Sequence, residues 1–274
     1  MKNMKPCISE ATTMAASFAE DVQAFSSAGF RAMEVWLTKL ETHLEKHSLA
    51  DTRKLLEDQQ MNLAAASYQG GLLISQGEER KVHFDHFRKR LEICQSLKVP
   101  QLLVIADFTG ETDSTSLERA LVSLKQAAQW ASGFEVRLGL EFRSSAAFCR
   151  SLDTATALVT QCNEPNLGIC LDLFHYYTGP SKLEDLKALT KETLSFVQVC
   201  DLAGVPRELA RDADRILPGD GDFQLGPICE RIREIGYNGY VSLELMNPVL
   251  WDMPGPRVAE MGMKSLDRLL EPHS

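Results

Sequence analysis

Short apolar runs alternate with longer amphipathic stretches along the whole chain. The apolar runs have the length of buried strands, and they begin near Cys7, Ala32, Met61, Gln101, Val136, Asn166, Ser195 and Tyr240. Between them lie stretches such as residues 84–97, 116–131 and 227–236, in which apolar residues recur at spacings of three and four. Such spacing is typical of amphipathic helices. The pattern therefore predicts a strand followed by a helix, repeated along the chain.

Eight strand–helix units in 274 residues indicate how the strands are arranged. A closed (β/α)8 barrel usually takes about 250 residues, so we predict an α/β fold with a single TIM barrel. Residues 1–274 contain no linker or low-complexity segment, and we expect them to form one domain. An open doubly wound sheet is the alternative, but the first strand–helix turn lacks the Gly-x-Gly-x-x-Gly pattern of dinucleotide-binding sheets.

Four of the predicted strands, the fifth to the eighth, each carry one polar residue among apolar ones. These residues are Glu141, Asp172, Gln198 and Glu244. Side chains alternate between the two faces of a strand, and the apolar neighbours on the other face are expected to contact the helices. The four polar side chains should then point into the barrel near the C-terminal ends of the strands, where active sites of this fold lie.

Three carboxylates and one amide oxygen at this position are the donor set of a metal site. Negative charges in a poorly solvated cavity repel one another, so either their pKa values rise or a cation binds among them. Oxygen ligands favour Mn²⁺ or Mg²⁺, with Co²⁺ and Zn²⁺ left open. The alternative is a simple salt bridge, for which Arg143, two residues after Glu141, is a candidate partner.

Charge and composition narrow the classes of function. A net charge of −9 and a pI near 5.3 argue against nucleic acid or an acidic membrane surface as a partner. Seven cysteines without a Cys-x-x-Cys pair predict reduced thiols in a cytoplasmic protein. The N-terminal residues do not read as a signal peptide, and no segment approaches the ~20 apolar residues of a membrane span.

Taken together, the motifs resemble the xylose-isomerase-like sugar isomerase/epimerase superfamily, over nearly the whole chain. The matching segments are LEF at Glu141, LDLFH at Asp172 and His175, VQVCD at Gln198, LEL at Glu244, and RILPGDGDF between the last two. Many members of that superfamily carry His where this chain has Gln198. Members similar to hydroxypyruvate isomerase, and some 3-dehydroshikimate dehydratases, carry Gln there.

The resemblance implies a metal-dependent isomerase or epimerase that acts on small keto-sugars or related keto compounds. Its metal ligands map onto Glu141, Asp172, Gln198 and Glu244. In such a reaction a divalent metal chelates a carbonyl oxygen and the adjacent hydroxyl, and it stabilises a cis-enediolate. The carboxylates of Glu141 and Glu244 would remove and return the proton.

The resemblance and the residues also suggest groups that bind the substrate. The superfamily counterpart of His175 contacts a substrate oxygen. Arg215 has the superfamily's spacing, whereas Arg207 lies earlier in the same loop, and either guanidinium suits a carboxylate or a pair of sugar oxygens. Glu34, on the second predicted strand, faces inward and is a further candidate.

The sequence leaves several questions open. It does not separate isomerisation from epimerisation, and a metal-dependent dehydratase of the 3-dehydroshikimate type is an alternative lyase reaction on the same barrel. DNA-repair nucleases share this barrel, but they need several histidines and a basic face, and only His175 is placed for the site here. A non-catalytic metabolite binder is a further alternative. The substrate and the subunit number, including a homo-oligomer, are not fixed by the sequence.

Overall fold

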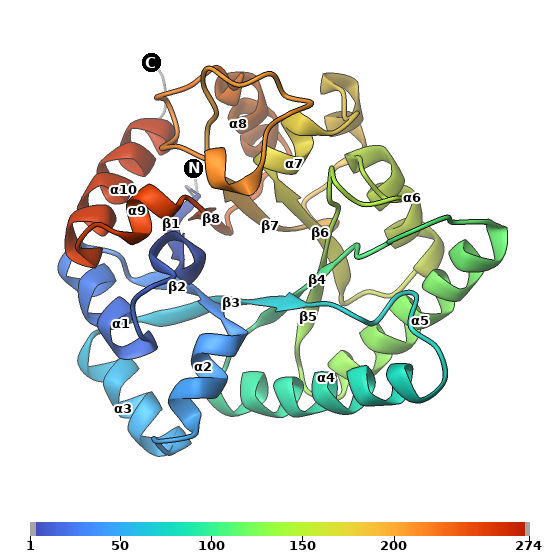
Figure 1. The fold of residues 1–274 in the computed structure, drawn as a ribbon, viewed down its shortest axis with the longest axis horizontal. Helices are drawn as coiled ribbons and strands as arrows, with labels where there is room; N and C mark the ends of the chain where they lie inside the picture. The colour runs from blue at the N-terminus through green and yellow to red at the C-terminus, as the bar shows by residue number, and fades with distance from the viewer. Residues whose placement is uncertain (1–3, 272–274) are drawn as a thin grey trace. The chain divides into compact units, whose positions relative to one another are not determined.

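Eight parallel strands close into a barrel in their sequence order (Figure 1). The computed structural model describes residues 4–271, so the first three and last three residues of the expected domain lie outside this range. Within it the strands are β1 (Lys5–Ser9), β2 (Ala32–Trp36), β3 (Asn62–Gln69), β4 (Gln101–Ile105), β5 (Arg137–Glu141), β6 (Leu167–Asp172), β7 (Leu194–Val199) and β8 (Tyr240–Leu243). The (β/α)8 TIM barrel predicted from the apolar pattern is thereby confirmed.

Helices follow the strands along the chain, and they include the stretches that the spacing of apolar residues indicated. The α-helices are α1 (Phe18–Ser27), α2 (Leu37–Leu44), α3 (Leu49–Asp58), α4 (Gly77–Leu97), α5 (Ser114–Ser132), α6 (Leu152–Cys162), α7 (Leu173–Thr178), α8 (Leu225–Glu234), α9 (Pro248–Trp251) and α10 (Gly255–Leu270). The 3-10 helices are η1 (Glu10–Thr13), η2 (Leu183–Ala188) and η3 (Asp212–Asp214). Among the helices of residues 4–271, none combines the length and the apolar character that crossing a membrane requires.

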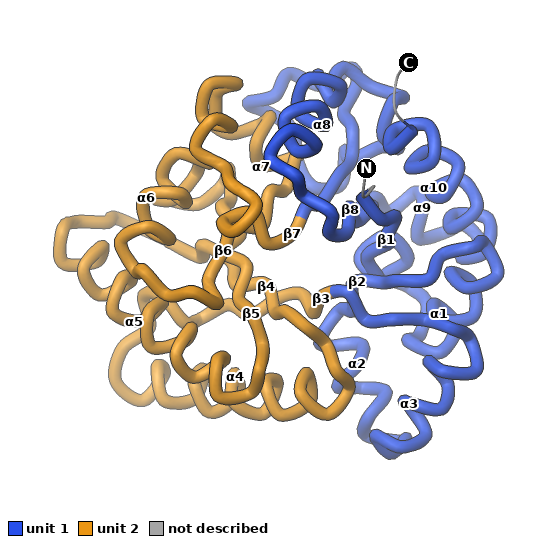
Figure 2. Tube along the Cα trace, turned by 180° about the vertical axis from the view of Figure 1, so that it is seen from behind, with its two compact units in different colours: residues 1–64, 197–274 blue, residues 65–196 orange. Residues whose placement is uncertain are grey.

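The internal contacts divide the chain into two compact units, which Figure 2 shows in different colours. Unit 1 comprises residues 1–64 and 197–274, and unit 2 comprises residues 65–196. Strands β1, β2 and β8 belong to unit 1, whereas β4, β5 and β6 belong to unit 2. Each unit contains its own group of buried carboxylates near the ends of its strands.

Strands β6 and β7 are buried along their whole length. Strands of parallel sheets are covered on both faces, which is why their sequences are almost continuously apolar. Asp172 at the end of β6 and Gln198 near the end of β7 are therefore polar groups held away from water. The seven cysteines are all free and buried.

The end of β6 differs from the sequence expectation. The apolar run predicts a strand that continues to Phe174, but β6 stops at Asp172 and α7 begins at the next residue. The cause is local, because the Asp172 side chain accepts a hydrogen bond of 2.8 Å from the Phe174 N–H and caps the helix. Asp is among the residues that are most favoured at this position.

Candidate active site

Three polar side chains gather at the C-terminal ends of β5 and β6 in unit 2. Glu141 ends β5, Asp172 ends β6, and His175 lies one turn into α7. Their exposed fractions are only 7%, 0% and 2%. One potential ligand atom from each residue lies within 4.8 Å of those of the other two. The structure thus brings two of the predicted carboxylates, Glu141 and Asp172, together with the imidazole of His175.

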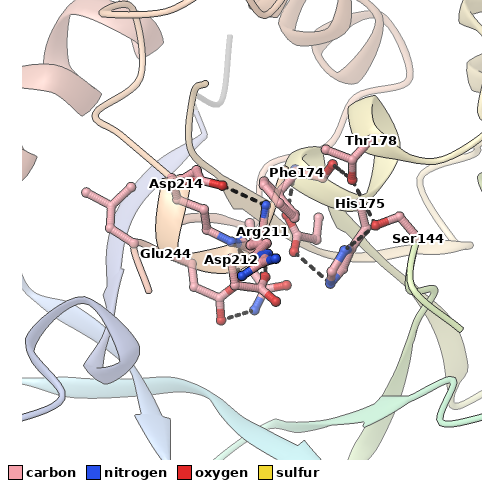
Figure 3. Close-up of polar contacts among 12 residues, drawn as sticks. Ser144, Phe174, His175, Thr178, Arg211, Asp212, Asp214 and Glu244 are labelled. Carbon is pink, nitrogen blue, oxygen red and sulfur yellow. Dashed lines mark hydrogen bonds and ion pairs between the residues drawn. The ribbon is translucent and has the colours of Figure 1, made fainter. Parts of the chain in front are cut away.

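His175 presents one edge of its ring to the carboxylates and the other to a pair of hydroxyls. Its Nε2 atom lies 3.6 Å from Glu141 Oε1 and 3.6 Å from Asp172 Oδ2, which is beyond normal hydrogen-bond length. Its Nδ1 atom is 3.2 Å from the Ser144 hydroxyl, to which Thr178 donates at 2.8 Å (Figure 3). Ser144 and Thr178 therefore help to orient the imidazole, and the sequence analysis did not identify them.

Asp172 has two roles within this cluster. Its Oδ1 atom accepts the Phe174 N–H at the start of α7, while its Oδ2 atom faces the imidazole of His175. A hydrogen bond from the backbone at the start of a helix stabilises a carboxylate there. The hydrogen bond of the helix cap thus offsets part of the cost of burying this charge. It also leaves Oδ2 facing the imidazole of His175.

A second polar cluster lies in unit 1, around the side-chain amide of Gln198. The Nε2 atom of Gln198 donates to Glu34 Oε1 at 2.9 Å and to Glu244 Oε1 at 3.0 Å. All three residues are buried, with exposed fractions of 0% for Glu34, 1% for Gln198 and 4% for Glu244. Because the amide nitrogen serves both carboxylates, the amide oxygen is the atom of Gln198 that can accept a bond or bind a cation.

Arg215 completes the cluster in unit 1. Its guanidinium is 1% exposed and donates from Nη1 to Glu244 Oε2 at 3.0 Å. It also donates from Nε and Nη2 to Asp212 Oδ1, at 3.1 and 2.8 Å; Figure 3 labels Asp212 and Glu244. Arg207, by contrast, has a half-exposed side chain that contacts Glu208 at 3.6 Å. Of the two candidate arginines, the structure places only Arg215 beside a predicted site residue.

The loop that carries this arginine is held by a buried carboxylate. Asp201 follows β7 and forms a two-way backbone bridge with Ile216. Its side chain accepts the backbone N–H groups of Gly219 and Phe223, each at 2.9 Å. A Cβ atom on Gly221 would lie 2.3 Å from Asp201 Oδ1, so only glycine fits there. The glycine-rich segment thus shapes the turn around Asp201.

The donor atoms of these clusters suit a divalent metal. In unit 2, two carboxylates and an imidazole lie close together and are shielded from water. Carboxylate oxygens suit Mg²⁺ and Mn²⁺, and the added imidazole also suits Zn²⁺ and Co²⁺. The four ligands predicted from the sequence form two pairs, Glu141 with Asp172 in unit 2 and Gln198 with Glu244 in unit 1.

Comparison with known protein families agrees with this architecture. A model of the family described as "Xylose isomerase-like TIM barrel" matches residues 22–269, which is most of the chain. The chain belongs to the xylose isomerase-like TIM barrel family. Its strand order and the polar residues at its strand ends can therefore be considered in the context of that family.

Relatives in this family include enzymes of two reaction classes. An inosose isomerase of Bacillus velezensis is 26% identical over 256 residues, covering 89% of each chain. A 3-dehydroshikimate dehydratase of Pseudomonas aeruginosa is 26% identical over 259 residues, covering 93% of this chain and 40% of the relative. Among solved structures, the IolI protein with a bound zinc atom has a TM-score of 0.92 at 22% identity and covers 97% of this chain and 98% of its own.

Proposed function

We propose that this protein is a divalent-metal-dependent isomerase or epimerase that acts on a small keto-sugar or a related keto compound. The observation that carries the proposal is the buried group of Glu141, Asp172 and His175 at the strand ends of a family TIM barrel. The inosose isomerase relatives support the same reaction class. The substrate is then a small molecule with a carbonyl next to a hydroxyl-bearing carbon.

We further propose that Glu141, Asp172, Gln198 and Glu244 together hold the metal. Two findings support this set. The four residues stand at or beside the C-terminal ends of β5, β6, β7 and β8, which are consecutive strands of the barrel, and Gln198 Nε2 lies 3.0 Å from Glu244 Oε1, so these two residues are in contact. When bound, the metal supplies Lewis-acid stabilisation of negative charge on the substrate oxygens.

The carboxylates of Glu141 and Glu244 are the groups that move the proton in this proposal. One, in its ionised form, takes the proton from the carbon beside the carbonyl, and the other, in its protonated form, donates its own proton to the neighbouring carbon or to the opposite face. Arg215 supports the role of Glu244, because its 3.0 Å bond to Oε2 orients the carboxylate.

The remaining predicted residues bind or orient groups in this scheme. His175 is proposed to contact a substrate oxygen through Nε2, since its Nδ1 edge already faces Ser144. Glu34 is proposed to act through Gln198, whose amide it holds at 2.9 Å. Arg207 is exposed and contacts its chain neighbour, so we propose Arg215 as the arginine of the site.

A dehydratase is the second candidate, and two observations favour it. The chain carries Gln198, the residue that the sequence resemblance connects with some 3-dehydroshikimate dehydratases, and such enzymes are among its relatives. The same removal of a proton beside a carbonyl would then be followed by loss of a β-hydroxyl group rather than by return of the proton. An aromatic product that absorbs ultraviolet light would identify this reaction with 3-dehydroshikimate.

Proton NMR in D₂O tests the proposed function directly. The protein is incubated with Mg²⁺ and a panel of ketoses, inososes and small keto acids, and entry of deuterium at carbon is followed. We expect incorporation with at least one compound, and we expect EDTA to stop it. Absence of exchange across the panel, from protein that binds Mg²⁺, would contradict an isomerase of this substrate class.

A further inference from the structure

A separate pocket lies in unit 1, between helix α2 and the segment that leads from η1 into α1. Its volume is about 540 Å³, which is within the usual range for sites that bind small organic molecules. Figure 2 labels both helices within unit 1. Among the described residues, the lining of this pocket includes no member of either carboxylate cluster.

One side of the pocket is a basic stripe. It consists of Lys39, Thr42, His43, Lys46 and His47, all of which line the pocket. Their spacing of three and four residues places them on one face of α2 and of the turn that continues it. Two lysines and two histidines thus gather on one side of the pocket in a chain whose net charge is −9, and such groups can attract an anion.

The two lysines of the pocket differ in how their charges are compensated. Lys39 contacts Asp21, at 2.5 Å between Nζ and Oδ2. Glu20 is the one carboxylate of the lining, and it folds back on Ser17, whose backbone N–H and hydroxyl donate to it at 2.8 and 2.7 Å. Lys46 is exposed, and no ion pair involves it within residues 4–271. Its positive charge remains available to a ligand.

The two histidines of the stripe stack on each other. Their ring centroids are 4.4 Å apart with an angle of 19° between the planes, and Phe18 lies 4.8 Å from His43. Burial and the neighbouring His47 lower the pKa of His43. Two imidazoles this close repel each other when both are protonated, and a bound anion would remove that penalty. An anion bound beside the stacked pair would therefore favour the protonated form of His43.

We propose that this pocket binds a phosphate monoester whose organic part is apolar or aromatic. The ammonium of Lys46 and the imidazoles of the stripe are separate donors, and they suit the terminal oxygens of a phosphate group. The lining also has an apolar wall that includes Met14 and Trp36, which can contact an apolar group. Such a wall and a volume well above that of a phosphate ion favour an ester over the free ion.

Phenyl phosphate is the probe that tests this site, with phenol as its uncharged analogue. Each is titrated into the full-length protein, and the ring C–H signals of His43 and His47 are followed by NMR. The signals are assigned from the His43→Ala and His47→Ala variants. We expect a saturable shift of both signals with phenyl phosphate and none with phenol. Lys46→Ala should weaken binding about tenfold, or about 1.4 kcal/mol.

The matched control is Lys54→Ala. Lys54 is an exposed lysine on α3, paired with Asp58, and its loss changes the net charge of the protein by the same amount. We expect this variant to bind phenyl phosphate as the parent protein does. The proposal is overturned if phenol shifts the two signals as strongly as phenyl phosphate, or if the Lys46 and Lys54 variants bind phenyl phosphate equally well.

Discussion

The two carboxylate clusters of the barrel differ in how their charges are compensated. In unit 1, Glu244 receives hydrogen bonds of 3.0 Å both from the amide of Gln198 and from the guanidinium of Arg215. In unit 2, the imidazole of His175 stands 3.6 Å from the nearest oxygens of Glu141 and Asp172. Hydrogen bonds join the members of the first cluster, whereas in the second the imidazole contacts the two carboxylates at a longer distance.

This difference suggests that the two clusters have different roles. Short charge-assisted hydrogen bonds fix the position of a carboxylate. They also compensate part of its negative charge, so the carboxylate attracts a further cation less strongly. The group in unit 2 instead combines two carboxylates with an imidazole, which is a mixed oxygen and nitrogen ligand set for a divalent cation. We therefore expect the cluster of Glu141 and Asp172 to dominate metal affinity, and the cluster around Glu244 to dominate the positioning of the proton-transfer group.

The largest expected effect follows from Glu244→Gln. The substitution keeps the shape of the side chain and removes the charge, and loss of a general acid or base typically lowers the rate by about 10²- to 10⁴-fold. We expect turnover to be lost while thermal unfolding shows a folded barrel. Glu260→Gln on α10, an exposed position, is the matched control. Unchanged turnover in the Glu244 variant would contradict the proposal that this cluster transfers the proton.

Asp172→Asn separates the charge of the metal site from the helix cap. Asn caps helices as well as Asp does, so α7 should be retained while one negative charge is lost. We expect metal affinity, measured by calorimetry, to fall by at least roughly tenfold, with little change in the melting temperature of the metal-free protein. Asp172→Ala should lower both quantities. Equal metal affinity in the Asn variant and the parent protein would contradict the proposed dominance of unit 2.

Replacement of each arginine by lysine compares the two candidates directly. Lysine keeps the charge, but it lacks the planar guanidinium whose nitrogen atoms bond to Asp212 and Glu244 at the same time. We expect Arg215→Lys to lower kcat about tenfold, the equivalent of one charge-assisted hydrogen bond. Arg207→Lys changes an exposed side chain and should leave the kinetics unaltered. The opposite order of effects would assign the site to Arg207.

The sequence was most informative where apolar and polar residues recur at regular intervals. The eight apolar runs predicted the strands, and the strand alternation identified Glu141, Asp172, Gln198 and Glu244 as polar residues near the strand ends. It could not choose between the two arginines, because both lie in one loop whose path depends on the bridge from Asp201 to the residue after Arg215.

Residues outside the strands were missed for a related reason. Ser144 follows β5, Thr178 ends α7, and Asp212 starts η3. A hydroxyl or carboxylate in such segments has no periodic signal that separates it from ordinary loop residues. Their contacts with His175 and Arg215 become visible only when the chain is folded.

A third group of buried acids, Glu10 and Asp21 of unit 1, shows another way in which this fold accommodates such charges. Both side chains are fully buried, and the ammonium of Lys39 lies 2.5 Å from Asp21. Glu10 accepts the Trp36 N–H at 2.7 Å. Burial and the charge of Asp21 raise the pKa of Glu10 well above its ordinary value of 4.5. Here a lysine and a retained proton limit the negative charge, in contrast to the cluster proposed to bind a metal.

Glu10→Gln tests this contrast through the pH dependence of stability, and its effect should be the smallest of the four. An unfolded Glu releases its proton near pH 4.5, whereas the folded protein retains it to higher pH. Between these two pKa values the folded state binds more protons, so stability falls as the pH rises. Glutamine has no proton to release, so the variant lacks this loss of stability. We expect it to melt at a higher temperature than the parent protein at neutral and alkaline pH, and we expect the two melting temperatures to converge below pH 4.5. If the melting temperatures of the variant and the parent protein differed by the same amount at every pH, as we expect for the control Glu260→Gln, Glu10 would be ionised in the folded protein.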